Sequence, residues 1–197
     1  MQIRPEVVQF IQKQVNDKTL SFSLFANYNS TALNYRKLIR DHLFTEHSAH
    51  FSREQLAQLS DLQVVPKASQ GHFSISHNEK IGGFSYSELP HGFDAEVKKR
   101  ISRAIIERTS TVAEIKDAPD LSFLWVAKEA AFKALDSSTL DRPRQLIMTD
   151  LICTEWQSHP DTQIVSFRIA PEKTLVHSLN LGFVFSEEDV LFSIYFK

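Results

Sequence analysis

The stretch from Leu121 to Leu135 carries three charged side chains in a segment that is otherwise almost entirely apolar. At 3.6 residues per turn, apolar residues cover most of its circumference, which predicts a buried helix. Lys128 falls inside the apolar stripe, while Glu129 and Lys133 lie one turn apart on a polar edge. Because a buried charge must be paired or must bind a ligand, this helix is a candidate for chemistry. The alternative is a surface ion pair between Glu129 and Lys133, with Lys128 reaching outward to solvent.

Two further acids are spaced for the same chemistry. Asp94 and Glu96 lie two apart in a predicted strand, so their carboxylates project from the same side. Together with Glu129 they would supply three carboxylates, the oxygen donors that Mg²⁺ prefers. Lys128 and Lys133 would then flank the metal with positive charge. Carboxylates, Mg²⁺ and lysines are the groups that catalyse phosphoryl transfer, although the sequence contains no Walker motif.

The elements that position these residues follow from hydrophobic periodicity and turn signals. Helices are predicted at 5–15, 31–44, 52–59, 97–114 and 121–135. Strands are predicted at 20–28, 73–77, 81–86, 92–96, 146–155, 163–169, 174–185 and 190–196. The strands between 73 and 96 are expected to form an antiparallel meander. We therefore predict an α+β protein of two similar halves, 1–98 and 99–197, in a pseudo-twofold arrangement with a ligand cleft between them.

Composition limits the class of protein. The 22 Lys and Arg residues against 24 Asp and Glu residues give a formal charge of -2, which argues against a broad nucleic-acid surface. Cys153 is the single cysteine and allows no internal disulfide, as is usual in a reducing compartment. The sequence has neither a signal-like start nor a stretch of about 18 apolar residues. We expect a cytoplasmic monomer that acts on neither membranes nor nucleic acids.

Three motifs in order resemble the 4′-phosphopantetheinyl transferases, in the two-halved form that activates surfactin synthetase and related carrier-protein systems. The motifs are Phe73–His77, Gly92–Glu96 and Trp125–Lys133. Each motif alone would be a weak signal, but three with matching order and spacing are fairly specific. With their flanking helices they cover about half of the chain, and the remainder agrees in coarse pattern.

The resemblance implies a set of metal and coenzyme A contacts. It implies that Asp94, Glu96 and Glu129 hold Mg²⁺ and that coenzyme A lies between the halves. It also implies that His77, with Ser76, contacts the 3′-phosphate of coenzyme A.

Basic residues would complete the coenzyme A site. Lys133 would contact the pyrophosphate, and Lys128 would lie beside it. Lys67 is a candidate for a further phosphate contact. Arg36 and Arg40, four residues apart on the helix at 31–44, could face the same anion or form a solvated surface stripe.

The activity implied by the resemblance is transfer of 4′-phosphopantetheine from coenzyme A to a serine of an apo acyl or peptidyl carrier protein, releasing 3′,5′-ADP. Such a transferase would serve fatty acid, polyketide or nonribosomal peptide biosynthesis. Glu129 would act as the general base, directly or through a water. Two alternatives stay open: a non-catalytic module that binds coenzyme A or a carrier protein, and an unrelated Mg²⁺-dependent phosphohydrolase.

Overall fold

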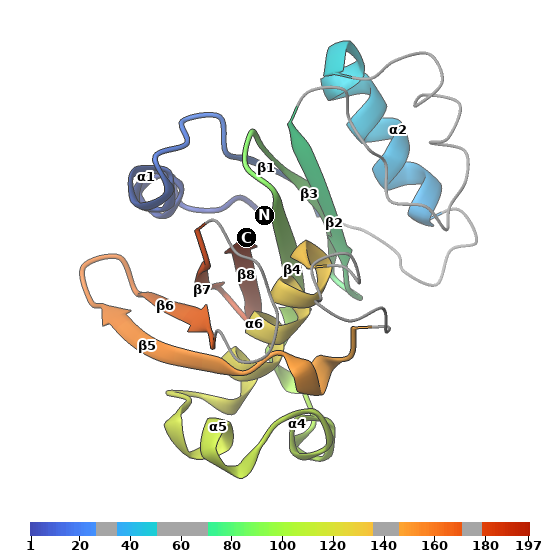
Figure 1. Cartoon of the computed structure of the whole chain (residues 1–197). Coiled ribbons are helices and arrows are strands. Elements are labelled where there is room, and N and C mark those ends of the chain that lie inside the picture. Colours follow the sequence, from blue (N-terminus) through green and yellow to red (C-terminus); the bar gives the residue numbers. More distant parts are fainter. Residues whose placement is uncertain (27–34, 51–70, 136–145, 171–178) are drawn as a thin grey trace.

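A computed structural model of the chain describes residues 1–26, 35–50, 71–135, 146–170 and 179–197. It confirms an α+β protein with one sheet of three strands and one of five (Figure 1). The strands are β1 (Ser21–Ala26), β2 (His72–His77), β3 (Ile81–Ser87), β4 (His91–Val97), β5 (Cys153–His159), β6 (Ile164–Ile169), β7 (Leu181–Glu187) and β8 (Val190–Phe196). The helices are α1 (Pro5–Val15), α2 (Tyr35–His47), α4 (Arg103–Thr109), α5 (Val112–Asp117) and α6 (Leu121–Ala134), with short 3₁₀ helices at Ser48–His50, Lys98–Arg100 and Met148–Asp150.

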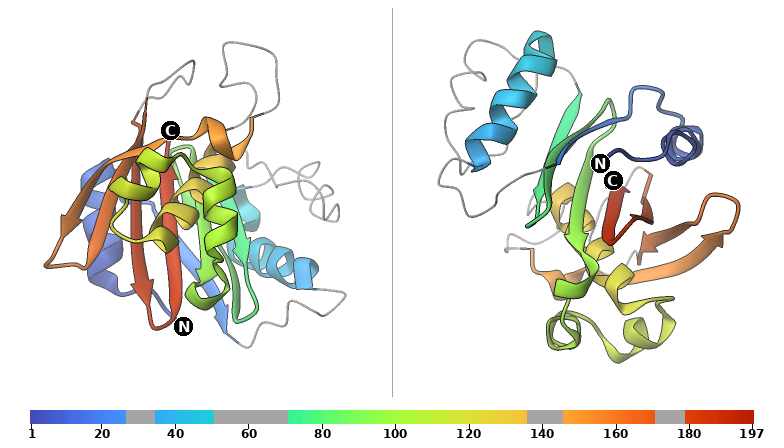
Figure 2. Two further views of the ribbon diagram at one scale, coloured as in Figure 1. Left: turned by 90° about the horizontal axis from the view of Figure 1, so that it is seen from below. Right: turned by 180° about the vertical axis from the view of Figure 1, so that it is seen from behind.

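The five-stranded sheet, in the order β4-β8-β7-β6-β5, is the centre of the molecule. Neighbouring strand residues point to opposite faces, so Phe192 packs with α1 while Leu191 packs with α6. The two helices lie on opposite faces of the sheet (Figure 2). Both are apolar on the side that meets the sheet, and two separate cores result. A third core joins α2 to β2 and β3.

Strand β4 does not belong to the same sheet as β3, the strand with which the sequence predicted it to pair. The antiparallel pairing of β2 with β3 confirms the first two strands of the expected meander. Its third strand is wrong, because β3 pairs on its other edge with β1 while β4 pairs antiparallel with β8. Side chains of β2 connect the two sheets instead. The Ser74 hydroxyl accepts a hydrogen bond of 2.8 Å from the Phe93 N–H, and the Ser76 hydroxyl accepts one of 3.0 Å from the Ala95 N–H. These serines satisfy backbone donors that a neighbouring strand would otherwise pair.

The segment predicted as one helix at 97–114 is also different. It contains a 3₁₀ turn, α4 and the start of α5, because local caps interrupt it. Ser102 accepts a hydrogen bond from the Ile105 N–H, and Thr111 with Glu114 forms a capping box. Each cap starts a new short helix, and Ser110 between them is extended.

Other predicted elements agree in type, with changed boundaries. The predicted strand at 146–155 begins as a 3₁₀ turn, and β5 starts at Cys153. The predicted helix at 52–59 lies outside the described residues, as does most of 174–180. Strand β4 belongs to the predicted first half, 1–98, but it is part of the five-stranded sheet that the second half, 99–197, otherwise forms. The pseudo-twofold relation between the halves stays a prediction. In the described part of the chain, no helix is both long and apolar enough to cross a membrane.

A buried histidine stands where β3 approaches β4. The His91 Nδ1–H donates to the Leu89 carbonyl at 3.0 Å, so the opposite nitrogen, Nε2, accepts from the Ser85 hydroxyl at 2.7 Å. Burial lowers the pKa of His91 to about 4. The neutral ring is therefore a fixed part of the contact between the sheets.

We predict that His91 makes folding sensitive to mild acid. Above pH 6.5 the ring is neutral in both states, whereas between 6.5 and about 4 only the unfolded chain takes up the proton. The free energy of unfolding should therefore fall with pH across this window, by on the order of 3 kcal/mol in total. Urea denaturation of the wild type and of His91→Gln at pH 7 and pH 5 measures it, and the variant should lose this share of the pH dependence. An NMR titration in which His91 protonates near pH 6.5 would contradict the assignment.

Candidate functional site

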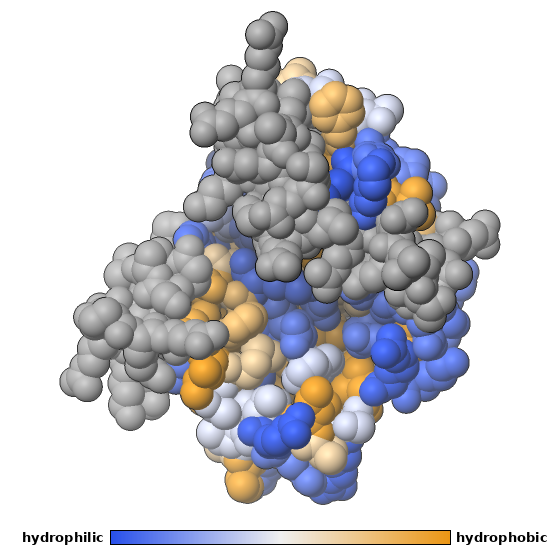
Figure 3. Space-filling view, turned by 90° about the vertical axis from the view of Figure 1, so that its right-hand side faces the viewer, coloured by the Kyte–Doolittle hydropathy of each residue, from blue (hydrophilic) through white to orange (hydrophobic). Residues whose placement is uncertain are grey.

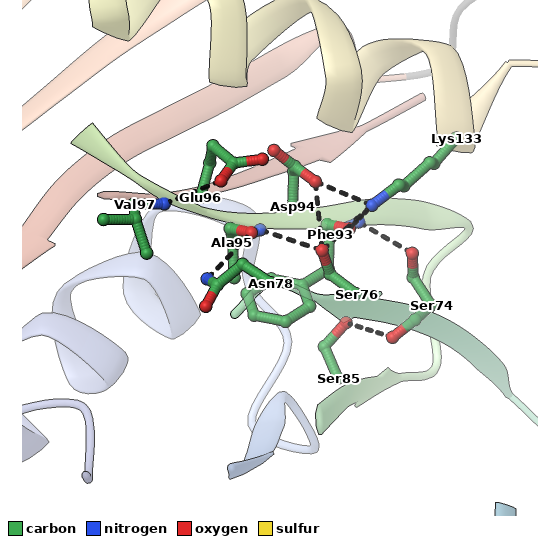
Figure 4. Close-up of polar contacts among 10 residues, drawn as sticks. All are labelled: Ser74, Ser76, Asn78, Ser85, Phe93, Asp94, Ala95, Glu96, Val97 and Lys133. Carbon is green, nitrogen blue, oxygen red and sulfur yellow. Dashed lines mark hydrogen bonds and ion pairs between the residues drawn. The ribbon is translucent and has the colours of Figure 1, made fainter. Parts of the chain in front are cut away.

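Asp94 and Glu96 project from the same side of β4, toward α6 (Figure 4). The alternate residues Phe93 and Ala95 are buried in the core on the other face. Asp94 itself is 6% exposed, so its carboxylate needs a partner. The strand pattern thus separates an acidic face from an apolar one, as expected from the sequence.

Lys133 is the partner of Asp94. Its ammonium donates to Asp94 Oδ1 at 2.7 Å, to the Ser76 hydroxyl at 3.1 Å and to the Phe93 carbonyl at 3.1 Å (Figure 4). The Ser76 hydroxyl donates in turn to Asp94 Oδ1 at 3.0 Å. One side chain at the end of α6 therefore connects that helix to both β4 and β2.

Glu129 and Glu96 complete the acidic group. Burial and then the charge of Asp94 raise the pKa of Glu129 to about 7, against an opposing effect of Lys133. The pKa of Glu96 is also raised, mainly by burial, although its carboxylate accepts a hydrogen bond from the Val97 N–H at 2.9 Å. The charges of Asp94 and Glu96 both act on Glu129. The three acids are therefore electrostatically coupled, and their joint role as metal ligands stays a prediction.

The donor chemistry of this group fits a hard divalent cation. Burial first, and then repulsion from the neighbouring acids, raises the pKa values of Glu96 and Glu129, and a cation would stabilise their charged forms. Across the described ranges, no three acidic, His or Cys side chains already converge closely enough to coordinate one ion. Lys133 holds one oxygen of Asp94 instead.

Gly92 brings the helix this close to the strand, and its role was not predicted from the sequence. A Cβ atom at Gly92 would lie 2.1 Å from the Ala130 carbonyl oxygen and 2.4 Å from the Ala134 nitrogen. The absence of a side chain therefore lets α6 rest directly on β4, two residues from Asp94. Small residues on the helix, including Ala127, Ala130 and Ala131, are fully buried in the same contact.

We predict that Gly92→Ala forces α6 away from β4. Because the clash involves backbone atoms, we expect a loss of about 1–3 kcal/mol or more in the free energy of unfolding. The Lys133–Asp94 contact should lengthen as well. Urea denaturation measures the first effect, and unchanged stability would mean that the helix and the strand lie farther apart in solution.

Lys128 does not join the acidic group, which corrects the expectation that it flanks a metal. Its side chain is fully buried and forms an ion pair of 2.8 Å with Glu114 of α5. The ammonium also donates to the Thr109 carbonyl at 2.7 Å. Glu114 accepts further hydrogen bonds from the backbone N–H groups of Thr111 and Cys153. The pair is thus a satisfied structural network, and the alternative of a solvated Lys128 is wrong too.

We predict that removing one member of the Lys128–Glu114 pair destabilises the protein strongly, whereas replacing both members by uncharged residues destabilises it little. Glu114→Gln leaves the Lys128 ammonium buried without its counter-ion and should destabilise the protein by about 3–5 kcal/mol. Adding Lys128→Met should recover most of that loss. Glu107→Gln, which removes the exposed partner of Arg103, is the control and should change stability by less than about 1 kcal/mol. Similar denaturation midpoints for Glu114→Gln and Glu107→Gln would contradict the buried pair.

The other residues that were predicted to contact coenzyme A lie on β2, on α2 and outside the described part of the chain. Ser76 and His77 are on β2, and Ser76 belongs to the Lys133 contact. Arg40, on α2, is only 7% exposed, so it is not part of a solvated stripe. Arg36 lies in the first turn of the same helix, but its side chain is outside the described part of the chain, as is the whole of Lys67.

Two signals in the sequence could have indicated structural roles that the sequence analysis missed, those of the β2 serines and of the Thr111–Glu114 cap. Ser74 and Ser76 alternate in the strand motif, so their hydroxyls face the same neighbour. The Thr111 to Glu114 spacing is that of a capping box, which predicts a new helix start there. The close approach at Gly92, in contrast, depends on which helix packs over the strand.

Figure 3 shows one face of the molecule, on which hydrophilic residues gather near the centre of the view with hydrophobic patches beside them.

Comparison with protein-family models and with curated proteins finds no match for the chain. The functional argument therefore depends on the site's own chemistry.

Proposed function

We propose that the protein is a Mg²⁺-dependent 4′-phosphopantetheinyl transferase that modifies a serine of an apo acyl or peptidyl carrier protein. The observation that carries the proposal is the joining of Asp94 and Glu96 on β4 with Glu129 and Lys133 on α6 into one electrostatic group. Three acids beside a lysine suit the transfer of a phosphate-linked group, since they provide a cation site and a proton acceptor. The motif resemblance supplies the identity of the transferred group.

Asp94, Glu96 and Glu129 are the residues that would hold Mg²⁺. The ion, when bound, would neutralise charge that develops on the pyrophosphate oxygens of coenzyme A. Glu129 accepts the proton of the carrier serine, directly or through a water, as the serine oxygen bonds to the phosphorus next to pantetheine. The bond from that phosphorus to the bridging oxygen breaks, and 3′,5′-ADP leaves with this oxygen.

The motif resemblance suggests the coenzyme A contacts, and the surroundings of Lys133 support part of the assignment. Lys133 is the cation for the pyrophosphate. Of the two 3′-phosphate contacts that the resemblance implies, Ser76 and His77 on the adjacent strand, His77 stays the candidate. Because the Ser76 hydroxyl already bonds to Asp94 and to the Ala95 N–H, we assign Ser76 to positioning these groups.

The remaining expectations complete the proposal. Arg36, Arg40 and Lys67 stay candidates for the nucleotide end. We propose that coenzyme A lies in a cleft between the two pseudo-twofold halves of a cytoplasmic monomer.

We predict that the protein adds one phosphopantetheine group to an apo carrier protein in the presence of coenzyme A and Mg²⁺. Intact-mass spectrometry of the carrier detects the product, and excess chelator should abolish it. Glu129→Gln keeps the side-chain size but removes the proton acceptor and one carboxylate, so turnover should fall by at least about 10². The matched control Glu107→Gln changes an exposed acid of α4 and should keep full turnover.

Other outcomes would decide between the alternatives. Coenzyme A binding without transfer to any of several apo carriers would favour the non-catalytic module. Release of phosphate or free phosphopantetheine without an acceptor would favour a phosphohydrolase. Undiminished turnover by Glu129→Gln would remove Glu129 from the reaction.

A further inference from the structure

The Lys133 ammonium has three N–H donors, and the protein supplies three acceptors for them. These are the Asp94 Oδ1 atom at 2.7 Å, the Ser76 hydroxyl at 3.1 Å and the Phe93 carbonyl oxygen at 3.1 Å. The lysine is thus saturated by its own protein. It must give up at least one of these contacts before it can bind a phosphate.

Asp94 depends on this lysine for charge balance. The Asp94 side chain is 9% exposed, and its negative charge acts on the neighbouring acids Glu96 and Glu129, which repel it in turn. In the metal-free protein Lys133 is therefore the counter-ion of the Asp94 carboxylate. A divalent cation at the same carboxylates would take over that role and would repel the ammonium.

Lys133 is also able to move. Its side chain is 27% exposed, and it occupies the last turn of α6, which ends at Ala134. The four-carbon stem of a lysine allows its ammonium to swing without a change in the backbone. Lys128 on the same helix is fully buried and has no such freedom.

We propose that Lys133 is an internal cation that occupies Asp94 in the metal-free protein and is released when a divalent cation binds. Release frees an N–H donor and a positive charge for an anionic phosphate group. Cation binding and phosphate binding therefore favour each other, because each is opposed by the same Lys133–Asp94 contact. This inference rests on the divalent-cation site of the proposed function, but not on transfer to a carrier protein.

The test measures cation binding alone, with no coenzyme A and no carrier. Free Mn²⁺ is followed by electron paramagnetic resonance as it is titrated into the wild type and into Lys133→Met. Removing the competing charge should tighten Mn²⁺ binding by at least about tenfold. Lys98→Met is the matched control, since the Lys98 ammonium contacts Asp120 at the same 2.7 Å at the start of α6. Its Mn²⁺ affinity should stay within about twofold of the wild type.

Thermal melting gives a second readout of the same competition. Without metal, Lys133→Met should melt below the wild type because Asp94 loses its counter-ion, and Mg²⁺ should raise the melting temperature of the variant more than that of the wild type. If Lys133→Met does not fold, Lys133→Gln decides the same comparison, since its amide still donates to Ser76 and to the Phe93 carbonyl.

The outcomes separate this inference from the proposed function. Equal or weaker Mn²⁺ binding by the neutral variant would overturn it, and so would the absence of Mn²⁺ binding by both proteins. Tighter binding by the variant, together with no transfer of phosphopantetheine by the wild type, would support the internal cation and overturn the transferase.

Discussion

The contact between α6 and β4 is the constraint on which the rest of the structure depends. Backbone meets backbone at Gly92, and the alanines of α6 are small enough to keep the helix on the sheet. This short separation allows a lysine on the helix to bond to an aspartate and a carbonyl on the strand. A larger residue at Gly92 would be accommodated only by separating the two elements that carry the acidic group.

The charges of α6 show how one helix serves two purposes. Lys128 is paired with Glu114 on α5 and holds the helix to the layer formed by α4 and α5. Glu129 and Lys133 belong to the opposite polar edge, beside β4 and β2. Because the first pair is buried and fully hydrogen-bonded, it resists rotation of the helix about its axis. The direction in which Glu129 points is thereby fixed by a contact on the other side of α6.

Strand β4 connects the two sheets without pairing its backbone to both. Its ladder runs with β8, and toward β2 its N–H groups are satisfied by Ser74 and Ser76. Since Ser76 also bonds to Asp94 and Lys133, the junction between the sheets and the acidic group share a hydroxyl. A ligand that draws Lys133 away would consequently act on the junction as well.

Much of the local structure was determined by the sequence itself. The helices α1 and α6 and most strands follow from periodicity, because one face of each must be buried wherever the element lies. The same rule placed Asp94 and Glu96 on one side of β4, and the need to compensate buried charge made α6 a candidate for chemistry.

Tertiary structure decided the partners. Periodicity predicts that a strand has an apolar face, but it does not specify the neighbour, so the third strand of the meander predicted at 73–96 was wrong and β4 pairs with β8. It likewise puts Lys128 inside an apolar stripe without deciding whether the side chain is buried or which carboxylate lies opposite. A partner on another helix, Glu114, keeps Lys128 from the acidic group. Partner choice depends on contacts between segments far apart in the chain, whose geometry exists only after the layers pack. That is the physical reason why the sequence indicated the charged residues, whereas the fold alone decided which of them meet.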